Sequence, residues 1–167
     1  MTKLPDNPAL LKLYRNGKSD KEIAAMFDVS FQAVNKRLRE MGIWRAPFKA
    51  QAQDILEHVW PKAETQRTKF MRLNRARDLF YFLRRRLGDK ALTELEMRGS
   101  ERFEALIREG DVVLALMPNA PEGPWVLEPR LDSDGRMVIR WPEGRPPLAD
   151  EKHRAALDLP LKPWGES

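Results

Sequence analysis

The sequence predicts a mainly α-helical protein with a small antiparallel β-sheet near its C-terminal end, an α+β architecture. Two observations support this class. Apolar residues recur at helical spacing through residues 8–41 and again through 51–110, whereas β-branched residues gather in short runs within 111–141. Residues 42–50 contain a glycine and a proline, which favour a linker between the helical stretches. We therefore expect an N-terminal three-helix domain and a second domain of helices and a β-hairpin.

These elements divide the 167 residues into three regions. The length suits one domain or two small ones, and the arrangement of the elements favours two, which we place at residues 1–45 and 46–142. Residues 143–167 are rich in proline and are expected to be a mostly irregular tail, with a short helix near residues 150–157.

Three short runs predict the sheet. Residues 111–116 form a short apolar run with two β-branched valines that ends before Pro118. Residues 125–128 and 137–141 lie on either side of Asp132-Ser133-Asp134-Gly135. Asp-Gly supplies the positive φ that a hairpin turn requires. We expect a three-stranded antiparallel sheet that packs on the preceding helices.

Helix signals follow one another closely in residues 19–38. Ser19 or Asp20 is expected to cap a helix, and Glu22 lies in its first turn, where it complements the helix dipole. Ile23 and Phe27 are four residues apart and share the buried face. An upstream helix that ends at Gly17 completes the three-helix core; its apolar residues are Leu10, Leu11, Leu13 and Tyr14.

The sharp turn after this helix is Asp28-Val29-Ser30. The apolar side chain of Val29 is expected to pack between the two helices, and Ser30 is a good N-cap for the second helix. Val34 and Leu38 continue the buried face of that helix. The order Ile-Ala, Val-Ser, Val and Leu resembles the helix-turn-helix of bacterial and phage DNA-binding proteins. Asp28 replaces the usual glycine at a position that often needs a left-handed backbone, which Asp tolerates.

If the second helix enters a major groove, its N-terminal side chains face the bases. Gln or Asn pairs with adenine, Lys pairs with guanine, and Phe packs on a thymine methyl. The candidate base contacts are Phe31, Gln32, Asn35 and Lys36, and the candidate phosphate contacts are Ser30, Arg37 and Arg39. The alternatives are an ordinary αα-hairpin, a Phe31 side chain buried under the turn and an Asn35 side chain in solvent.

A basic segment follows the linker. Residues 62–86 contain nine Lys and Arg residues against only Glu64 and Asp78. Arg72 and Arg75 lie beside an apolar stripe and are candidates for a phosphate-binding face; a solvated basic face is the alternative. The stripe expected in the core consists of Phe70, Leu73, Phe80 and Leu83.

The overall charge is asymmetric. Residues 1–90 carry 20 basic and 10 acidic residues, net +10, whereas residues 91–167 carry 10 and 15, net −5. This asymmetry favours a polyanion as partner of the first part, although a charge-rich solvated surface is an alternative.

Several classes of protein are excluded by composition. The chain has no cysteine, which excludes a disulfide scaffold, a Cys-ligated zinc and a thiol nucleophile, and suits a reducing compartment. No apolar run is long enough to span a membrane. His58 and His153 have no second ligand at suitable spacing. We expect no metal, cofactor, small-molecule substrate or catalytic residue, and therefore not an enzyme.

The order of blocks resembles a known family. The helix-turn-helix is followed by Trp60-Pro61, by Lys69-Phe70, Arg72-Leu73 and Arg75, by residues 106–114, and by Trp141-Pro142. This is similar to the immunity repressors of temperate actinobacteriophages, over roughly residues 19–142. The resemblance implies a repressor in the bacterial cytoplasm that maintains lysogeny, binding asymmetric operator and stoperator sites on double-stranded DNA as a monomer. It also implies a second DNA-binding domain, in which Lys69, Arg72 and Arg75 are the nearest candidates.

Two hypotheses from other classes remain open. A DNA recombinase fragment would need a nucleophile or a two-metal carboxylate cluster, but Ser100 and Ser133 have no visible base partner and Tyr81 lies in an apolar turn. A packaging protein similar to a small terminase subunit would bind DNA through the helix-turn-helix. Its acidic part, residues 91–167, would assemble with partner proteins.

Overall fold

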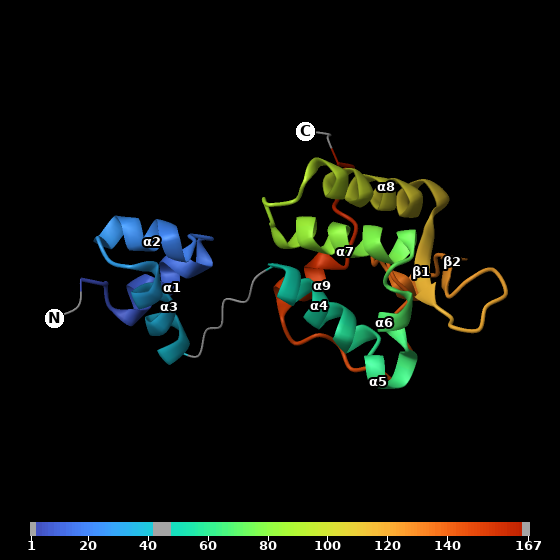
Figure 1. Cartoon of the computed structure of the whole chain (residues 1–167), viewed down its shortest axis with the longest axis horizontal. Helices are drawn as coiled ribbons and strands as arrows, with labels where there is room; N and C mark the ends of the chain where they lie inside the picture. Colours follow the sequence, from blue (N-terminus) through green and yellow to red (C-terminus); the bar gives the residue numbers. More distant parts are fainter. Residues whose placement is uncertain (1–2, 42–47, 165–167) are drawn as a thin grey trace. The chain divides into compact units, whose positions relative to one another are not determined.

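The computed structural model describes residues 3–41 and 48–164, and the chain divides into two compact units, Met1–Ala46 and Pro47–Ser167 (Figure 1). Each unit has its own hydrophobic core. The structure is mainly helical with a small antiparallel sheet, which confirms the predicted fold class. Of the expected linker, residues 42–47 lie outside the described residues. Residues 48–50 are helical, so the linker prediction is wrong there.

The first unit contains the three predicted helices, α1 (Asn7–Arg15), α2 (Asp20–Phe27) and α3 (Phe31–Glu40). The apolar periodicity that predicted them is also the periodicity of burial, because residues three or four apart share one helix face. The buried side chains of this core are Leu4, Leu10, Ile23, Ala24, Val34 and Leu38.

Local capping fixes the points at which α2 and α3 begin. Ser19 and Glu22 form a reciprocal capping box, with Ser19 Oγ accepting the Glu22 N–H at 3.1 Å and a Glu22 carboxylate oxygen accepting the Ser19 N–H at 3.3 Å. Ser30 Oγ accepts the N–H of Ala33 at 3.2 Å, which confirms Ser30 as the N-cap of α3. Asp28 has φ 53° and ψ 51°, the left-handed conformation that its place in the turn predicts.

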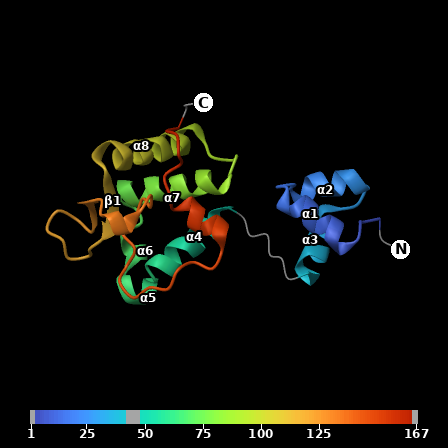
Figure 2. The same cartoon turned by 180° about the vertical axis from the view of Figure 1, so that it is seen from behind.

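The second unit begins with α4 (Phe48–Val59), the short helices α5 (Lys62–Thr65) and α6 (Arg67–Phe70), α7 (Asn74–Leu87) and α8 (Glu94–Gly110). Figures 1 and 2 show α7 packed between α4 and α8. The helices α7 and α8 approach closely at Gly99, where a Cβ would lie only 2.7 Å from Asp78 Oδ1 and 2.8 Å from the Tyr81 ring.

The predicted stripe along α6 and α7 is only partly correct. Leu83 is fully buried, and Phe70 and Phe80 pack half-buried against the core. Leu73, however, is 45% exposed. It is the N-cap residue of α7 and so precedes the helical face that turns toward the core.

The sheet has two strands, β1 (Val112–Leu116) and β2 (Trp125–Pro129), paired antiparallel with Leu114 opposite Leu127. The predicted third strand is wrong. Residues 137–139 form only isolated bridges: Ile139 pairs in a parallel sense with Leu114 of β1, on the edge away from β2, and Met137 pairs in an antiparallel sense with Asp158. The Leu114 N–H donates to the Val138 carbonyl at 2.9 Å, and the Leu114 carbonyl accepts the Arg140 N–H at 2.9 Å.

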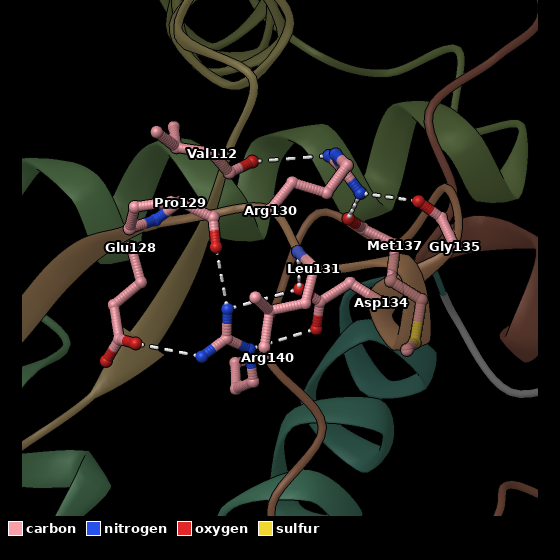
Figure 3. Close-up of polar contacts among 9 residues, drawn as sticks. All are labelled: Val112, Glu128, Pro129, Arg130, Leu131, Asp134, Gly135, Met137 and Arg140. Carbon is pink, nitrogen blue, oxygen red and sulfur yellow. Dashed lines mark hydrogen bonds and ion pairs between the residues drawn. The ribbon is translucent and has the colours of Figure 1, made fainter.

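Two arginines explain why the Asp-Gly segment does not form the expected hairpin with β2 (Figure 3). Arg130 donates through one guanidinium nitrogen to the carbonyls of Gly135 and Met137, at 2.8 and 2.7 Å. Arg140 binds the Asp134 carboxylate at 2.9 Å and the Glu128 carboxylate at 2.8 Å. These bonds hold residues 131–137 as a compact loop around the short 3₁₀ helix η1 (Asp132–Asp134), so the chain crosses to the far edge of β1.

Beyond the sheet, the chain remains part of the second unit. The predicted short helix is α9 (Glu151–Ala156). The rest of residues 143–164 is largely irregular, yet Leu148, Leu157 and Leu159 are buried in the core. Within the described residues, no helix combines the length and apolarity needed to cross a bilayer.

Candidate nucleic-acid interface

Helix α3 presents two different faces. Val34 and Leu38 have no exposed surface and pack into the core of the first unit. The opposite face carries Gln32, Lys36 and Arg39, which are all exposed. Because the Ser30 side chain caps the helix, its first turn is regular and its N-terminal side chains project from a fixed backbone.

Phe31 is the first residue of α3 and is 46% exposed, so it is not buried under the turn. The Phe31 ring is therefore accessible to an outside partner, and contact with one would remove apolar surface from water. Ser30 is also exposed, and its hydroxyl already serves the cap.

Two of the predicted contacts have partners within the first unit. The Asn35 side-chain amide donates to Asp20 Oδ2 at 3.3 Å, which connects α3 to the first residue of α2. Arg37 donates to the Pro5 carbonyl at 3.4 Å and to Asn7 Oδ1 at 3.3 Å. Arg37 therefore holds the start of α1 against α3, whereas Asn35 remains half-exposed beside the outer face.

Most arginines of the basic segment 62–86 form hydrogen bonds or ion pairs with other residues of the second unit. Arg84 has a side chain only 2% exposed, and its guanidinium binds Asp89 at 2.8 Å and Glu96 at 2.6 Å. Arg67 is similarly buried and binds Glu57 Oε2 at 2.7 Å and the Trp60 carbonyl at 2.9 Å.

These contacts also change the acidic partners. The Thr93 backbone N–H and the Arg84 guanidinium hold the pKa of Glu96 below its ordinary value. The Arg67 guanidinium does the same to the pKa of Glu57. A lowered carboxyl pKa means that the folded state favours the charged form, as expected for a functioning ion pair.

Four more basic residues of the segment also have internal partners. Arg85 forms a buried ion pair with Glu104. Arg86 donates to the Ala155 carbonyl at 3.0 Å and to the Asp158 carbonyl at 3.2 Å. Arg75 and Arg77 are exposed but bound, Arg75 to the Trp125 carbonyl at 2.8 Å and Arg77 to Asn74 Oδ1 at 2.7 Å.

Lys62 is exposed but lies beside the Glu57 carboxylate, which accepts its backbone N–H at 3.3 Å, so the segment leaves few cations for an outside partner. Lys69 is exposed and lies 5.9 Å from the centroid of the Phe70 ring. Arg72 is exposed, and within the described parts of the chain no hydrogen bond or ion pair holds its side chain. Together with Arg75, these two residues stand at the junction of α6 and α7, where the first turn of α7 contains no acidic residue.

Sequence reasoning missed the acidic partners, Asp20 in the first unit and Asp89, Glu96 and Glu104 in the second. The opposite charge of the two parts of the chain was a signal only for Glu96 and Glu104, because Asp20 and Asp89 lie within the basic part, residues 1–90. Net charge does not identify individual pairs, and the carboxylates that bind Arg84 and Arg85 lie 5 to 19 residues away from them in the chain.

The structure also bears on other kinds of site. A cavity of about 380 Å³ opens between α4, α7 and α8, with Lys49, Gln53 and Tyr81 among its lining residues. Among residues 3–41 and 48–164, no group of three or more His, Asp or Glu side chains is placed to hold a metal ion. His58 lies 2.7 Å from the Pro146 carbonyl, a structural contact.

Neither a protein-family model nor a curated protein sequence matches this chain. Its function is therefore inferred from the residues and their arrangement. The feature with the clearest chemical meaning is the outer face of α3.

Proposed function

We propose that this protein is a sequence-specific DNA-binding protein that acts as a transcriptional repressor, with α3 entering the major groove. One observation carries the proposal. A side-chain-capped helix on a three-helix platform buries Val34 and Leu38 and exposes Gln32 and Lys36 on the other face. A major groove admits a helix of this kind, and its donor and acceptor pattern distinguishes all four base pairs.

Each exposed side chain has a role that its chemistry permits. Gln32 offers an acceptor and a donor that match adenine, and Lys36 offers a donor that matches the two acceptors of guanine. Phe31 gains a partner for its exposed ring by packing on a thymine methyl. Arg39, in the last turn of α3, is assigned to a phosphate.

The first unit also carries most of the net charge. Its 46 residues include 9 Lys and Arg against 5 Asp and Glu, net +4, whereas the remaining 121 residues have 21 against 20, net +1. We propose that the second unit adds only a small phosphate contact through Lys69 and Arg72, with Arg75 beside them. This contact is much smaller than the nine basic residues of the segment suggest.

A narrower form of the proposal rests on the resemblance to actinobacteriophage immunity repressors. In this form the protein maintains lysogeny in the cytoplasm of a bacterial host. It binds asymmetric operators and stoperators as a monomer, and a monomer favours an asymmetric site because palindromic sites mirror two-fold protein symmetry.

The test is selection of bound sequences from random duplexes with the full chain, followed by affinity measurements on the selected site. We expect one asymmetric motif. Lys36→Ala should weaken binding to this site by about 5- to 150-fold, the value of one good base contact. The matched control is Lys12→Ala, which removes the same charge from an exposed position on α1. Equal losses for the two variants would refute base recognition by α3.

The same preparation separates the alternatives. Sedimentation that reveals a stable ring would favour a packaging subunit over a repressor. Cleavage of DNA by the purified protein with Mg²⁺ would favour a recombinase fragment.

A further inference from the structure

We propose that Asp20 is a positioning residue that fixes the Asn35 amide in the orientation that reads adenine. The observation is the hydrogen bond from Asn35 Nδ2 to Asp20 Oδ2, at 3.3 Å, between residues 15 positions apart. This inference rests on the proposed function, because it concerns how α3 recognises a base.

The bond determines which end of the amide faces Asp20. An ionised carboxylate only accepts hydrogen bonds, whereas an amide has an NH₂ donor end and a carbonyl acceptor end. Turning the Asn35 amide over would place its carbonyl oxygen against the carboxylate, two acceptors with no proton between them. Asp20 therefore selects the orientation with Nδ2 inward and leaves Oδ1 to face elsewhere.

The same bond leaves the adenine-binding edge of the amide available. Nδ2 carries two protons, one on the side of Oδ1 and one on the opposite side. A bidentate contact with adenine uses Oδ1 as acceptor from N6 and the proton on the Oδ1 side as donor to N7. Donation to Asp20 by the opposite proton uses neither partner of the adenine contact.

The position of Asp20 is itself well defined. It is the first residue of α2, directly after Ser19, whose capping box with Glu22 fixes the start of that helix. Both Asp20 and Asn35 are half-buried, which limits the rotamers of each. A side chain that is held before binding loses less conformational entropy on binding.

Gln32 provides an internal comparison. It is exposed, and within the described residues no hydrogen bond holds its side chain. Its longer side chain must be ordered by DNA alone. We therefore expect the site to show a sharper preference for adenine at the Asn35 position than at the Gln32 position.

The experiment compares four variants of the full chain by selection from random duplexes and by affinities for sites altered at single positions. Asn35→Ala identifies the position that Asn35 reads. Asp20→Asn keeps the size of the side chain but can present either a donor or an acceptor, so it no longer selects the amide orientation. The double variant completes a thermodynamic cycle. Asp28→Asn is the control, because it removes one exposed carboxylate and Asn tolerates the left-handed backbone there.

We expect Asp20→Asn to lower the preference for adenine by about 3- to 10-fold at the position identified by Asn35→Ala and nowhere else. It should have no further effect when Asn35 is already Ala, and Asp28→Asn should leave the preference unchanged. A merely structural role for Asp20 would weaken all positions alike.

Four results would overturn the inference. An unchanged preference in Asp20→Asn, with Asn35→Ala altering one position, removes the positioning role and leaves the proposed function intact. A base other than adenine at that position, or no position altered by Asn35→Ala, removes the recognition role of Asn35. Failure of the wild-type chain to enrich any sequence overturns the proposed function as well.

Discussion

Replacing Arg84 with Met tests whether the basic segment is part of the fold of the second unit. Met keeps an unbranched apolar stem in the place of the Arg84 stem but removes the guanidinium. Two carboxylates then lose their cation, Asp89 with a side chain 6% exposed and Glu96 with one 20% exposed. Removing one partner of a buried ion pair costs about 3–5 kcal/mol, mainly because the remaining charge is left uncompensated.

The matched control is Arg72→Met, the same substitution at an exposed position in the same segment. A surface change of this kind alters the free energy of unfolding by about 0.5 kcal/mol or less. For a unit of this size, the loss expected for Arg84→Met corresponds to a fall in Tm of about 10–20 °C. The control should remain within about 2 °C of the wild type.

Thermal and urea unfolding followed by tryptophan fluorescence measure the effect. The second unit contains Trp60 and Trp125, which are buried and in edge-to-face contact with ring centroids 5.2 Å apart. Their emission should change when this unit unfolds. If Arg84→Met unfolds within about 1 kcal/mol of the wild type, the internal ion-pair account is refuted.

Three further predictions concern caps, backbone and pH. Ser30→Ala should lower the free energy of unfolding of the first unit by about 1 kcal/mol in urea melts, and Ser30→Asn, which also caps, should not; equal losses would contradict the cap. Asp28→Gly should stabilise the same unit by up to about 1 kcal/mol, since Gly adopts φ 53° without strain, and a destabilised variant would contradict this. The pKa of Glu96 is lowered by folding, so the unfolded state binds more protons in acid. The stability from this group is present above about pH 4.5 and is lost as pH falls through the folded pKa. Urea midpoints at pH 7 and pH 3 should therefore differ less in Glu96→Gln than in the wild type, and an equal difference would exclude this carboxyl as a contributor.

The first unit could be predicted almost completely because its determinants are local. The capping box joins residues three positions apart, and the N-cap of α3 does the same. The helix faces follow from residues three or four apart. The contact between Asp20 and Asn35 was missed because it depends on how two helices cross, which no pattern within either helix specifies.

The second unit was less predictable because its pairing is not local. The loop around Asp134 contains a proper turn sequence, yet Arg130 and Arg140 direct the following chain to the far edge of β1. The basic segment has the same explanation. Along the chain, the segment contains few acidic residues to balance its basic ones. In the fold, however, Arg84 and Arg85 bind carboxylates of α8 and of the turn that precedes α8.

The internal pairing changes what the charge of this protein means for DNA binding. Each phosphate neutralised contributes about −0.9 to the slope of log affinity against log salt concentration. If all nine basic residues of the segment contacted DNA together with Lys36 and Arg39, the slope would be about −10. If only Lys69 and Arg72 add to the two residues of α3, as we propose, the slope should be about −4. Replacing Lys69 and Arg72 together with Met should therefore halve the measured slope. A slope near −10 that falls by only a fifth would show that the paired arginines leave their carboxylates to bind phosphate.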